Sequence, residues 1–251
     1  MKRAIDVLVA VTGLIVLAPV LAVVALLVWL EDSGPPFFAG QRVARGGGAF
    51  RMLKFRTMVP DAFRSGVNST AARDRRITRV GGWLRRWKLD ELPQLINVLR
   101  GEMSLVGPRP QVPVEVDMYT EAEKRMLRER PGITDLASIV FSDEAWILDG
   151  APDPDLMYHQ RIRPWKSRLA LFYVDRMAGG ATALDLRILA LTALASVRRE
   201  WALAGVQAIL EGEAEDELLR RMAGRQETLI PYPPPGAGDI VREYRARRVG
   251  A

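Results

Sequence analysis

Two adjacent carboxylates, Asp90 and Glu91, lie in a stretch of sequence that is otherwise rich in cations. The apolar residues after them recur with helical spacing, which predicts a helix with the pair at its start and Pro93 in its first turn. The unpaired amides and positive dipole end of a helix N-terminus favour an ionised carboxylate and attract phosphate. An ionised carboxylate among arginines is therefore a candidate nucleophile.

A structural interpretation of the acidic pair is also open. The two carboxylates could cap a helix and pair with Arg85, Arg86 and Lys88 on a solvated surface. Exposed ion pairs of this kind are common and contribute little to stability. Spacing alone favours this structural interpretation over the catalytic one.

A proline-rich segment follows, in which Arg109 stands between Pro108 and Pro110, with Pro113 beyond. Prolines fix φ and resist the helix, so the segment is expected to hold Arg109 on a stiff arm. A guanidinium held in this way can bind a phosphate through two parallel hydrogen bonds. Arg109 is therefore a candidate phosphate ligand.

The composition bounds the classes of site. A chain of 251 residues with 49% hydrophobic residues can bury one large core, or a core with an appendage. The absence of cysteine excludes disulfides, thiol nucleophiles and Cys-ligated zinc. The single histidine, His159, excludes a His-cluster metal site and is expected to be structural. A net charge of +6 indicates an anionic partner: nucleic acid, a lipid surface or a phosphorylated substrate.

An apolar run without a charge extends from Val7 to Leu30. As a helix it is long enough to cross a hydrocarbon core of about 30 Å, and it lacks the cleavage site of a signal peptide. Pro19 should kink or break it. Cations lie on both sides of the run, so it could be a spanning anchor or a broken helix that enters and leaves by one face. Composition alone favours the spanning anchor.

The next segments predict a β-hairpin and then a basic region. Strands over Phe37–Val43 and Ala49–Phe55 flank a glycine-rich turn, and the second strand leads into Lys54 and Arg56 on one face. The cations of the basic region are Arg73, Arg75, Arg76, Arg79, Arg85, Arg86 and Lys88, interleaved with Trp83 and Trp87. This composition suits a membrane interface or nucleic acid, and the attached apolar segment favours lipid.

Beyond residue 113 the pattern predicts mainly helices. They are expected over Val114–Arg130, over Leu156–Met177 with a break near Pro164, and from Thr182 through Leu194. Residues 133–154 are expected to be irregular, with an acidic group around Asp143 and Glu144 of unassigned role. The proline-rich tail after residue 230 is expected to be disordered or bound to a partner.

Several of these motifs, taken in order, resemble those of the bacterial sugar transferase family, the monotopic polyprenyl-phosphate phosphoglycosyl transferases. The resemblance covers roughly Lys2 to Thr192. Its motifs are Lys2-Arg3 before an apolar segment with Pro19, Lys54-Phe55-Arg56-Thr57-Met58, Leu89-Asp90-Glu91-Leu92-Pro93-Gln94-Leu95, Gly107-Pro108-Arg109-Pro110 and Arg130-Pro131-Gly132. This order of motifs outweighs the structural interpretation of the acidic pair.

The resemblance implies a mainly α fold with a small β-hairpin. It implies a re-entrant membrane helix over residues 1–32, joined to a catalytic domain over residues 33–198 on the cytoplasmic face of a bacterial inner membrane. Residues 199–251 would form a C-terminal extension, partly disordered or partner-binding. The implied enzyme transfers a sugar phosphate from a UDP-sugar to undecaprenyl phosphate and releases UMP. This would be the first membrane step in synthesis of an exopolysaccharide, O-antigen or glycoprotein glycan.

The resemblance also implies roles for individual residues. Asp90 would attack the β-phosphorus and form a covalent phosphosugar intermediate, and Glu91 would support metal binding or proton transfer. Mg²⁺ would be held by Asp90, with Glu91 or backbone groups. Arg85 and Arg109 would contact phosphate, and Lys54 and Arg56 are weaker candidates for the same role.

Three positions depart from the family's pattern. Ala18 stands before Pro19 where serine is frequent, and Lys88 stands where a serine or threonine cap is frequent. Asp135-Leu136-Ala137 replaces a glycine–tryptophan–alanine pattern, which puts the sugar specificity in doubt.

The expected partners are the two substrates, inner-membrane lipids, downstream glycosyltransferases and a second copy of the chain, with no nucleic acid. The alternative function is a non-enzymatic, membrane-anchored basic module that binds anionic lipid or nucleic acid.

Overall fold

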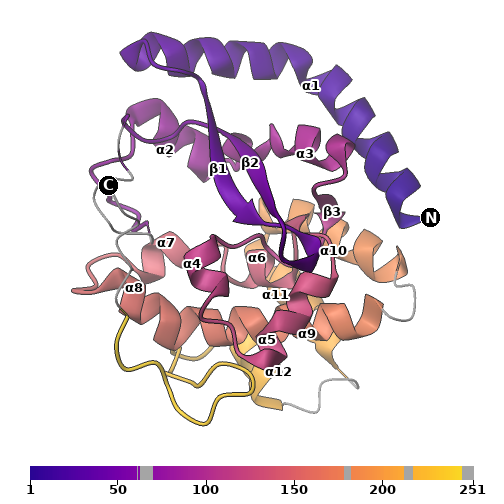
Figure 1. The fold of residues 1–251 in the computed structure, drawn as a ribbon, viewed down its shortest axis with the longest axis vertical. Helices are drawn as coiled ribbons and strands as arrows, with labels where there is room; N and C mark the ends of the chain where they lie inside the picture. Colours follow the sequence, from indigo (N-terminus) through magenta and orange to yellow (C-terminus); the bar gives the residue numbers. More distant parts are fainter. Residues whose placement is uncertain (61, 63–69, 178–181, 212–216, 245–251) are drawn as a thin grey trace.

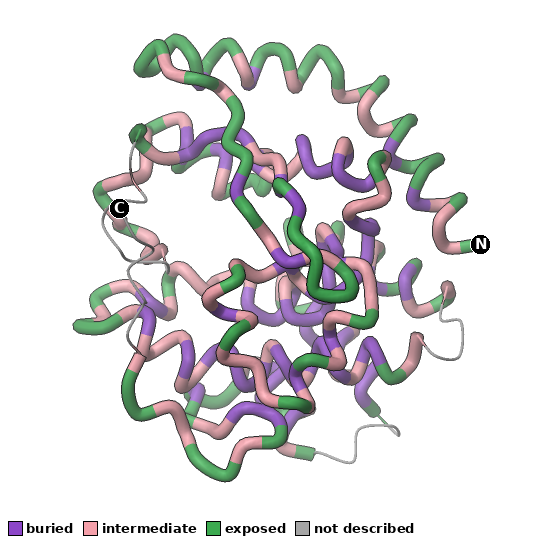
Figure 2. The backbone as a smooth tube through the Cα atoms, in the orientation of Figure 1, coloured by how far each residue is buried: buried purple, intermediate pink, exposed green. Residues whose placement is uncertain are grey.

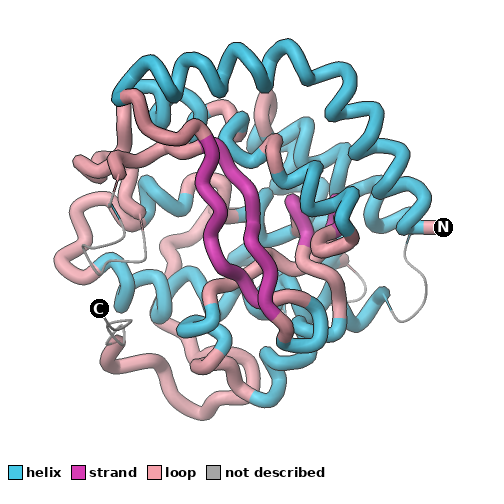
Figure 3. Tube along the Cα trace, turned by 45° about the horizontal axis from the view of Figure 1, so that its top comes forward, coloured by secondary structure: helices cyan, strands magenta, loops and turns pink. Residues whose placement is uncertain are grey.

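The computed structural model describes residues 1–60, 62, 70–177, 182–211 and 217–244. Within them the chain is mainly helical with two small sheets, as predicted (Figure 1). The hairpin lies across the middle of the view in Figure 3, and the long N-terminal helix packs directly on the helices Arg79–Arg86 and Gln94–Arg100.

The helices are α1 (Lys2–Asp32), α2 (Arg79–Arg86), α3 (Gln94–Arg100), α4 (Pro113–Val116), α5 (Glu121–Lys124), α6 (Leu136–Val140), α7 (Glu144–Ile147), α8 (Pro154–Met157), α9 (Arg163–Met177), α10 (Thr182–Ala195), α11 (Arg199–Leu210) and α12 (Glu217–Ala223). The strands are β1 (Phe37–Val43), β2 (Ala49–Phe55), β3 (Ser104–Val106) and β4 (Gly132–Thr134).

Helix α1 lies along one edge of the molecule and contains Pro19 (Figure 1). Its axis changes direction along its length, and the helix continues through Pro19 without an interruption. Most of the helix is exposed (Figure 2). Leu8, Ile15 and Val16 are each about two-thirds exposed. Among the described residues α1 is the only helix long and apolar enough to cross a membrane.

The N-terminal end of α1 is fixed to the following domain by its charged residues. Lys2 Nζ lies 2.8 Å from Asp185 Oδ2, and Arg3 donates to the last carbonyls of α3. The buried carboxylate of Asp6 accepts hydrogen bonds from Ser104 Oγ and from the amide of Leu105. The three charged residues that precede the apolar run therefore face the protein.

The C-terminal end of α1 is fixed to the same domain. Glu31 Oε1 accepts from the amides of Arg79 and Val80, at 2.8 and 3.2 Å, and so caps the start of α2. Asp32 receives two hydrogen bonds from the guanidinium of Arg56, which follows β2. Both ends of this apolar helix thus bind one domain.

Strands β1 and β2 pair antiparallel in the predicted register, from Phe37 opposite Phe55 to Val43 opposite Ala49. This confirms the hairpin and both strand boundaries. The buried Asn97 of α3 holds the hairpin, because its side chain donates to the carbonyl of Arg51 and accepts from the amide of Leu53. Strand β2 is therefore fixed beside the helix that follows the acidic pair.

Strands β3 and β4 form a short parallel pair that the sequence did not predict. The pair brings together the Gly107-Pro108-Arg109-Pro110 and Arg130-Pro131-Gly132 motifs. Gly107, directly after β3, contacts Gly132, the first residue of β4. A Cβ on Gly132 would lie 2.1 Å from Gly107 N, so only glycine permits this approach. The close crossing sets the direction in which the Arg109 segment leaves the sheet.

The main core lies between α6, α9, α10 and α11 (Figure 2). Its largest fully buried side chains include Leu136, Ile139, Trp165, Leu169 and Tyr173. Residues after 198 belong to the same core, through Ala202, Leu203 and Val206 of α11. The segment predicted to be an extension thus packs as part of the body of the molecule up to α12.

The expected helix over residues 114–130 is wrong, because α4 and α5 are separate. Thr120 starts a new helix through a capping box: its Oγ1 accepts from the amide of Glu123, and the Glu123 carboxylate accepts from its amide. The predicted break near Pro164 is a turn of π-helix, Tyr158–Ile162, directly before α9.

The described part of the C-terminal tail, residues 224–244, lies against the chain's own helices, at the bottom of Figure 1. Pro164 has no amide, so the carbonyl of Gln160 lacks its helical donor, and the amide of Tyr232 bonds it at 2.9 Å. The ring of Tyr232 stacks on Trp165 and lies under Arg168. The tail thus completes the backbone hydrogen bonding of a proline-interrupted helix.

The acidic group around Asp143 anchors this C-terminal half. Asp143 pairs with Arg199 of α11 at 3.0 Å and with Arg225 after α12 at 3.1 Å. Glu144 pairs with Lys166 of α9.

Candidate active site

The acidic pair lies in a 3-10 turn, Leu89–Glu91, between α2 and α3. Helix α3 begins at Gln94, with Pro93 as the residue before its first turn. The prediction that the pair opens this helix is therefore wrong by several residues. Pro93 cannot donate a backbone hydrogen bond, so the α-helical ladder starts after it, and the preceding residues form a tighter turn.

Asp90 is buried but keeps its carboxylate free. It is only 7% exposed, and no hydrogen bond or ion pair to it is found within the described part of the chain. Burial raises its pKa, and the nearby charges of Lys54, Arg85 and Lys88 only partly oppose that shift. The solvated-surface interpretation of this residue is therefore wrong. Asp90 is a desolvated acceptor beside cations, to which no group of the described residues is hydrogen-bonded.

Glu91, in contrast, is fully engaged. Lys54 Nζ lies 2.8 Å from its Oε1, and the guanidinium of Arg109 donates to both of its oxygens. Burial alone would raise the pKa of Glu91, but the charges of Arg109 and Lys54 lower it well below the usual range. Glu91 is therefore an ionised carboxylate that holds two cations next to Asp90.

Arg109 lies on the proline-rich arm, as predicted, and the arm is held on both sides. The carbonyl of Pro108 accepts from the amide of Gly132, and the carbonyl of Gln111 accepts from Val43 of β1. The charge of Glu91 raises the pKa of Arg109, so this guanidinium is a permanent cation. The arm thus connects the acidic pair with both sheets.

Arg85, at the end of α2, completes the group. Its Nε donates to Thr57 Oγ1 at 2.8 Å, just after β2. Burial lowers its pKa, and the charge of Asp90 opposes that shift. Lys54, Arg85, Asp90, Glu91 and Arg109 together are called the acidic-pair site below.

Arg56 is placed differently from the other predicted phosphate ligands. Its guanidinium is occupied by Asp32, and its Nε donates to the carbonyl of Pro35 at 2.8 Å. Alternation along β2 predicted Lys54 and Arg56 on one face, but only Lys54 contacts the acidic pair. In this structure Arg56 joins the end of α1 to the hairpin.

Two residues beside the acidic-pair site, Arg42 and Asp135, were not predicted from the sequence as site residues. Burial and the charge of Arg109 lower the pKa of Arg42, in β1, to about 10, which places a further cation near the arm. Asp135 is 2% exposed, and its Oδ2 accepts from the amide of Arg109 at 3.2 Å. Its Oδ1 caps α6 at the amide of Ser138. An aspartate before a run of apolar residues is a capping signal that could have located α6, though not the contact with Arg109.

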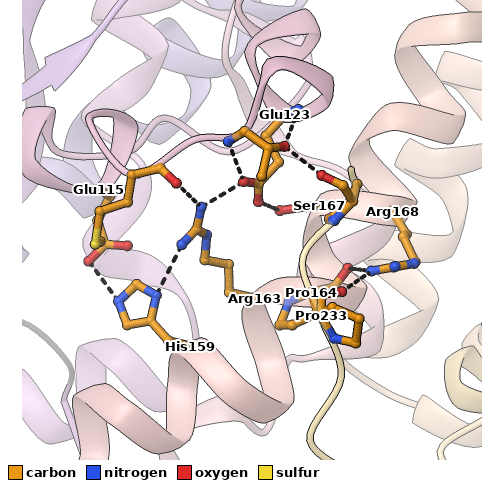
Figure 4. Close-up of polar contacts among 11 residues, drawn as sticks. Glu115, Glu123, His159, Arg163, Pro164, Ser167, Arg168 and Pro233 are labelled. Carbon is orange, nitrogen blue, oxygen red and sulfur yellow. Dashed lines mark hydrogen bonds and ion pairs between the residues drawn. The ribbon is translucent and has the colours of Figure 1, made fainter. Parts of the chain in front are cut away.

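A second charged group consists of Glu115, Glu123, His159, Arg163 and Ser167 and is called the buried ion cluster (Figure 4). Glu123 is fully buried and accepts from Arg163 NH2 and Ser167 Oγ, both at 2.7 Å. His159 is 1% exposed and lies 3.3 Å from Glu115 Oε1. The histidine is thus part of a buried network between α4, α5 and α9.

Comparisons with known proteins identify the family of the chain. The model of a family described as bacterial sugar transferase matches residues 1–199. The chain is similar to exopolysaccharide production protein ExoY of Sinorhizobium fredii, with 42% identity over 55% of this chain and 68% of that protein.

Two further relatives are longer than the matched region. A UDP-glucose:undecaprenyl-phosphate glucose-1-phosphate transferase of Caulobacter vibrioides is 44% identical over 55% of this chain and 53% of its own length. A UDP-N-acetylgalactosamine-undecaprenyl-phosphate N-acetylgalactosaminephosphotransferase of Aeromonas hydrophila is 41% identical over 70% of this chain and 43% of its own length.

Proposed function

Because the chain belongs to the bacterial sugar transferase family, we propose that it transfers a sugar 1-phosphate from a UDP-sugar to undecaprenyl phosphate and releases UMP. The chain is a phosphoglycosyl transferase. The names of its relatives support the two substrates and a place in exopolysaccharide synthesis.

The observation that carries the proposed mechanism is the free carboxylate of Asp90 beside Glu91 and its two bound cations. A carboxylate that approaches a pyrophosphate meets like charge, so a reactive one must lie among cations that bind the phosphoryl oxygens. Asp90 meets this requirement, and within the part of the chain that the structure describes its oxygens accept no hydrogen bond. Glu91 also lies among these cations, but both of its oxygens already accept hydrogen bonds from Lys54 and Arg109.

The proposed reaction has two displacements at the same phosphorus. An Asp90 oxygen forms a bond to the β-phosphorus of the UDP-sugar as the bond from that phosphorus to the bridging oxygen breaks, and UMP leaves with the electron pair. The phosphate oxygen of undecaprenyl phosphate then attacks the phosphosugar on Asp90 and releases the carboxylate. No net proton transfer is needed at Asp90, which suits a residue that acts as a nucleophile.

The other members of the site have roles in charge and position. Arg85 and Arg109 are proposed to bind phosphoryl oxygens, since each guanidinium has more donors than its protein partners use. Glu91 holds Arg109 and Lys54 in place, and its low pKa makes it a poor proton donor at neutral pH. Arg56 is not assigned to this group, because Asp32 occupies it.

The residues fit a Mg²⁺ ion. Among the described residues no three Asp, Glu or His side chains form a metal group of their own. Mg²⁺ is commonly bound through one or two carboxylates, with water and substrate phosphates completing its shell. Asp90, with its free oxygens, would hold the ion, and Glu91 lies next to it. When bound, the ion would neutralise charge on the pyrophosphate.

For the membrane, we propose that α1 enters and leaves by one face, with the domain on the cytoplasmic side. Both ends of α1 are bound through charged side chains to the same domain. Two ends held by one domain are hard to place on opposite faces of a bilayer, whereas the exposed apolar side chains between them can enter lipid. This supports the re-entrant arrangement over the spanning anchor.

The reaction is tested by UMP release from UDP-glucose and UDP-N-acetylgalactosamine with undecaprenyl phosphate in detergent, with and without Mg²⁺. A sugar-labelled donor incubated without undecaprenyl phosphate should leave label on the protein and release UMP in equal amount. The Asp90→Asn variant should carry no label. UMP release that requires both substrates together, with no labelled protein, would show a direct transfer and reject the covalent step.

The topology is tested with two cysteine variants of this cysteine-free chain. Ala4→Cys lies on the exposed side of the first turn of α1, and Val197→Cys is an exposed position between α10 and α11. An impermeant thiol reagent should label neither in intact cells and both after permeabilisation. Labelling of Ala4→Cys alone in intact cells would show a spanning helix. The predicted homodimer and downstream glycosyltransferases stay predictions.

A further inference from the structure

A recess that is partly open to solvent adjoins the arm that carries Arg109. Its walls include Arg109, Asp135, Ser138, Tyr158 and Lys166. They come from the arm, the start of α6, the π-helical turn and α9, which are far apart in sequence. The acidic-pair site and the recess therefore share Arg109 as a common wall.

We propose that this recess holds the sugar ring of the nucleotide sugar and that Ser138 contributes to the choice of sugar. The inference rests on the proposed function, which supplies the substrate. It assigns residues to sugar recognition, whereas the acidic-pair site concerns only phosphate chemistry.

The position of the recess supports a sugar ring. In a sugar 1-phosphate the ring is joined to the phosphorus through a single oxygen, so it must lie directly beside the group that binds the phosphate. Arg109 is that group in the proposed mechanism. Its backbone is held from the recess side, because its amide donates to the buried carboxylate of Asp135.

The charge balance of the walls favours an uncharged ligand. The three cations in the walls already have acidic partners: Arg109 has Glu91, Lys166 has Glu144, and Arg163 has Glu123. A second phosphate would therefore find little unbalanced positive charge. The carboxylate, amide and hydroxyl groups in the walls suit a ring with several hydroxyl donors. Uracil is a poorer match for carboxylates, because it offers one N–H and two carbonyl acceptors.

Ser138 is a hydroxyl-bearing lining residue with unused hydrogen-bonding capacity. Its Oγ is buried and has no hydrogen-bond partner in the described part of the chain, although its amide is capped by Asp135 at 2.6 Å. A buried polar group without a partner costs free energy, which a ligand hydroxyl would recover. Because the Oγ forms no hydrogen bond to any described residue, its removal should leave the fold intact.

The variant Ser138→Ala tests this inference, with Ser142→Ala as a matched control. Ser142 lies just after α6, and its hydroxyl accepts a hydrogen bond from Arg199 outside the recess. The assay is UMP release over UDP-glucose, UDP-galactose, UDP-N-acetylglucosamine and UDP-N-acetylgalactosamine, with UMP as a product inhibitor. Ser138→Ala should lower kcat/KM for the preferred sugar by about two- to tenfold, the range for one lost hydrogen bond.

The ratio of kcat/KM between the preferred sugar and the next should fall by a similar factor, while inhibition by UMP stays unchanged. Ser142→Ala should leave both unchanged. If Ser138→Ala weakens all donors and UMP equally, the recess holds the nucleoside and the inference is wrong. Unchanged sugar selection would also reject it. A wild-type chain that releases no UMP from any donor would instead reject the proposed function.

Discussion

The acidic-pair site and the buried ion cluster contain the same kinds of groups and use them in opposite ways. In the cluster, both oxygens of Glu123 accept hydrogen bonds from protein donors, and the residue is fully buried. In the acidic-pair site, Glu91 is bound in the same manner, but Asp90 is buried and its oxygens accept from no donor among the residues that the structure describes. A satisfied carboxylate stabilises a fold, whereas a desolvated and unbonded one costs stability and is available to a ligand.

The largest effect that we expect from this difference is the loss of UMP release in Asp90→Asn. The substitution keeps the shape of the side chain and removes the nucleophile, so UMP release should fall at least about a thousandfold, about 4 kcal/mol in activation free energy. Asp239→Asn, at an aspartate whose side chain is 87% exposed, is the control and should keep wild-type activity. A fall of less than tenfold for Asp90→Asn would mean that Asp90 does not form the covalent bond.

The buried ion cluster should show the reverse effect with Glu123→Gln. This change leaves Arg163 buried without its carboxylate, and a broken buried ion pair costs about 3–5 kcal/mol. Urea unfolding in detergent should therefore show a large loss in the free energy of unfolding. Asp90→Asn, measured in parallel, should show no loss. Equal losses for the two variants would remove the distinction between a structural and a reactive carboxylate.

The third prediction concerns the pH dependence of stability that the Asp90 carboxyl group causes. Burial raises the pKa of Asp90 above its ordinary value of 3.8, so the folded protein binds this proton more tightly than the unfolded chain. The stability that this proton provides is present below pH 3.8 and is lost as pH rises through the folded pKa. Asp90→Asn lacks this loss, so without Mg²⁺ it should become more stable than wild type as pH rises from 4 to 7.

Each unit by which the pKa of Asp90 in the folded protein exceeds its pKa in the unfolded chain corresponds to about 1.4 kcal/mol. This is the expected difference in the free energy of unfolding between Asp90→Asn and wild type. The measurement is the free energy of unfolding of both proteins at several pH values without Mg²⁺. Glu91 is present in both, so its own titration largely cancels. If wild type instead becomes more stable relative to Asp90→Asn as pH rises, the cations lower the pKa of Asp90 overall.

The sequence predicted the local parts of the site better than their contacts. The hairpin strands were placed correctly because alternation and a glycine-rich turn are local signals. The arm of Arg109 was placed as non-helical for a similar reason, since its prolines act on their own backbone. The helix start was misplaced, because Pro93 can stand either in a first turn or just before it.

The contacts depend on segments distant in sequence, which local patterns do not specify. Nothing in the alternation of β2 shows that Asp32 occupies Arg56 while Lys54 reaches Glu91. The contact between Asp135 and Arg109 depends on the crossing at Gly107 and Gly132, which follows from the parallel strand pair. The acidic pair could be named from the sequence, but only the fold shows which carboxylate is free.

The smallest effect is expected where the C-terminal tail meets the buried ion cluster, at Tyr244. Its hydroxyl donates to Glu115 Oε1 at 3.1 Å, and its ring stacks on His159 with centroids 4.2 Å apart. Tyr244→Phe keeps the ring and removes one hydrogen bond, so it should cost about 0.5–1.5 kcal/mol in the free energy of unfolding. Tyr244→Ala removes the stacked ring as well and should cost more.

Because Glu115 also lines the recess, the same pair of variants shows whether the tail supports that wall. If it does, Tyr244→Ala should raise KM for the UDP-sugar by a larger factor than Tyr244→Phe, with kcat nearly unchanged, since Asp90 and Arg109 are not altered. Initial rates at saturating undecaprenyl phosphate measure this. Equal KM values for both variants and wild type would confine the tail to stability, leaving recognition to residues within the family match.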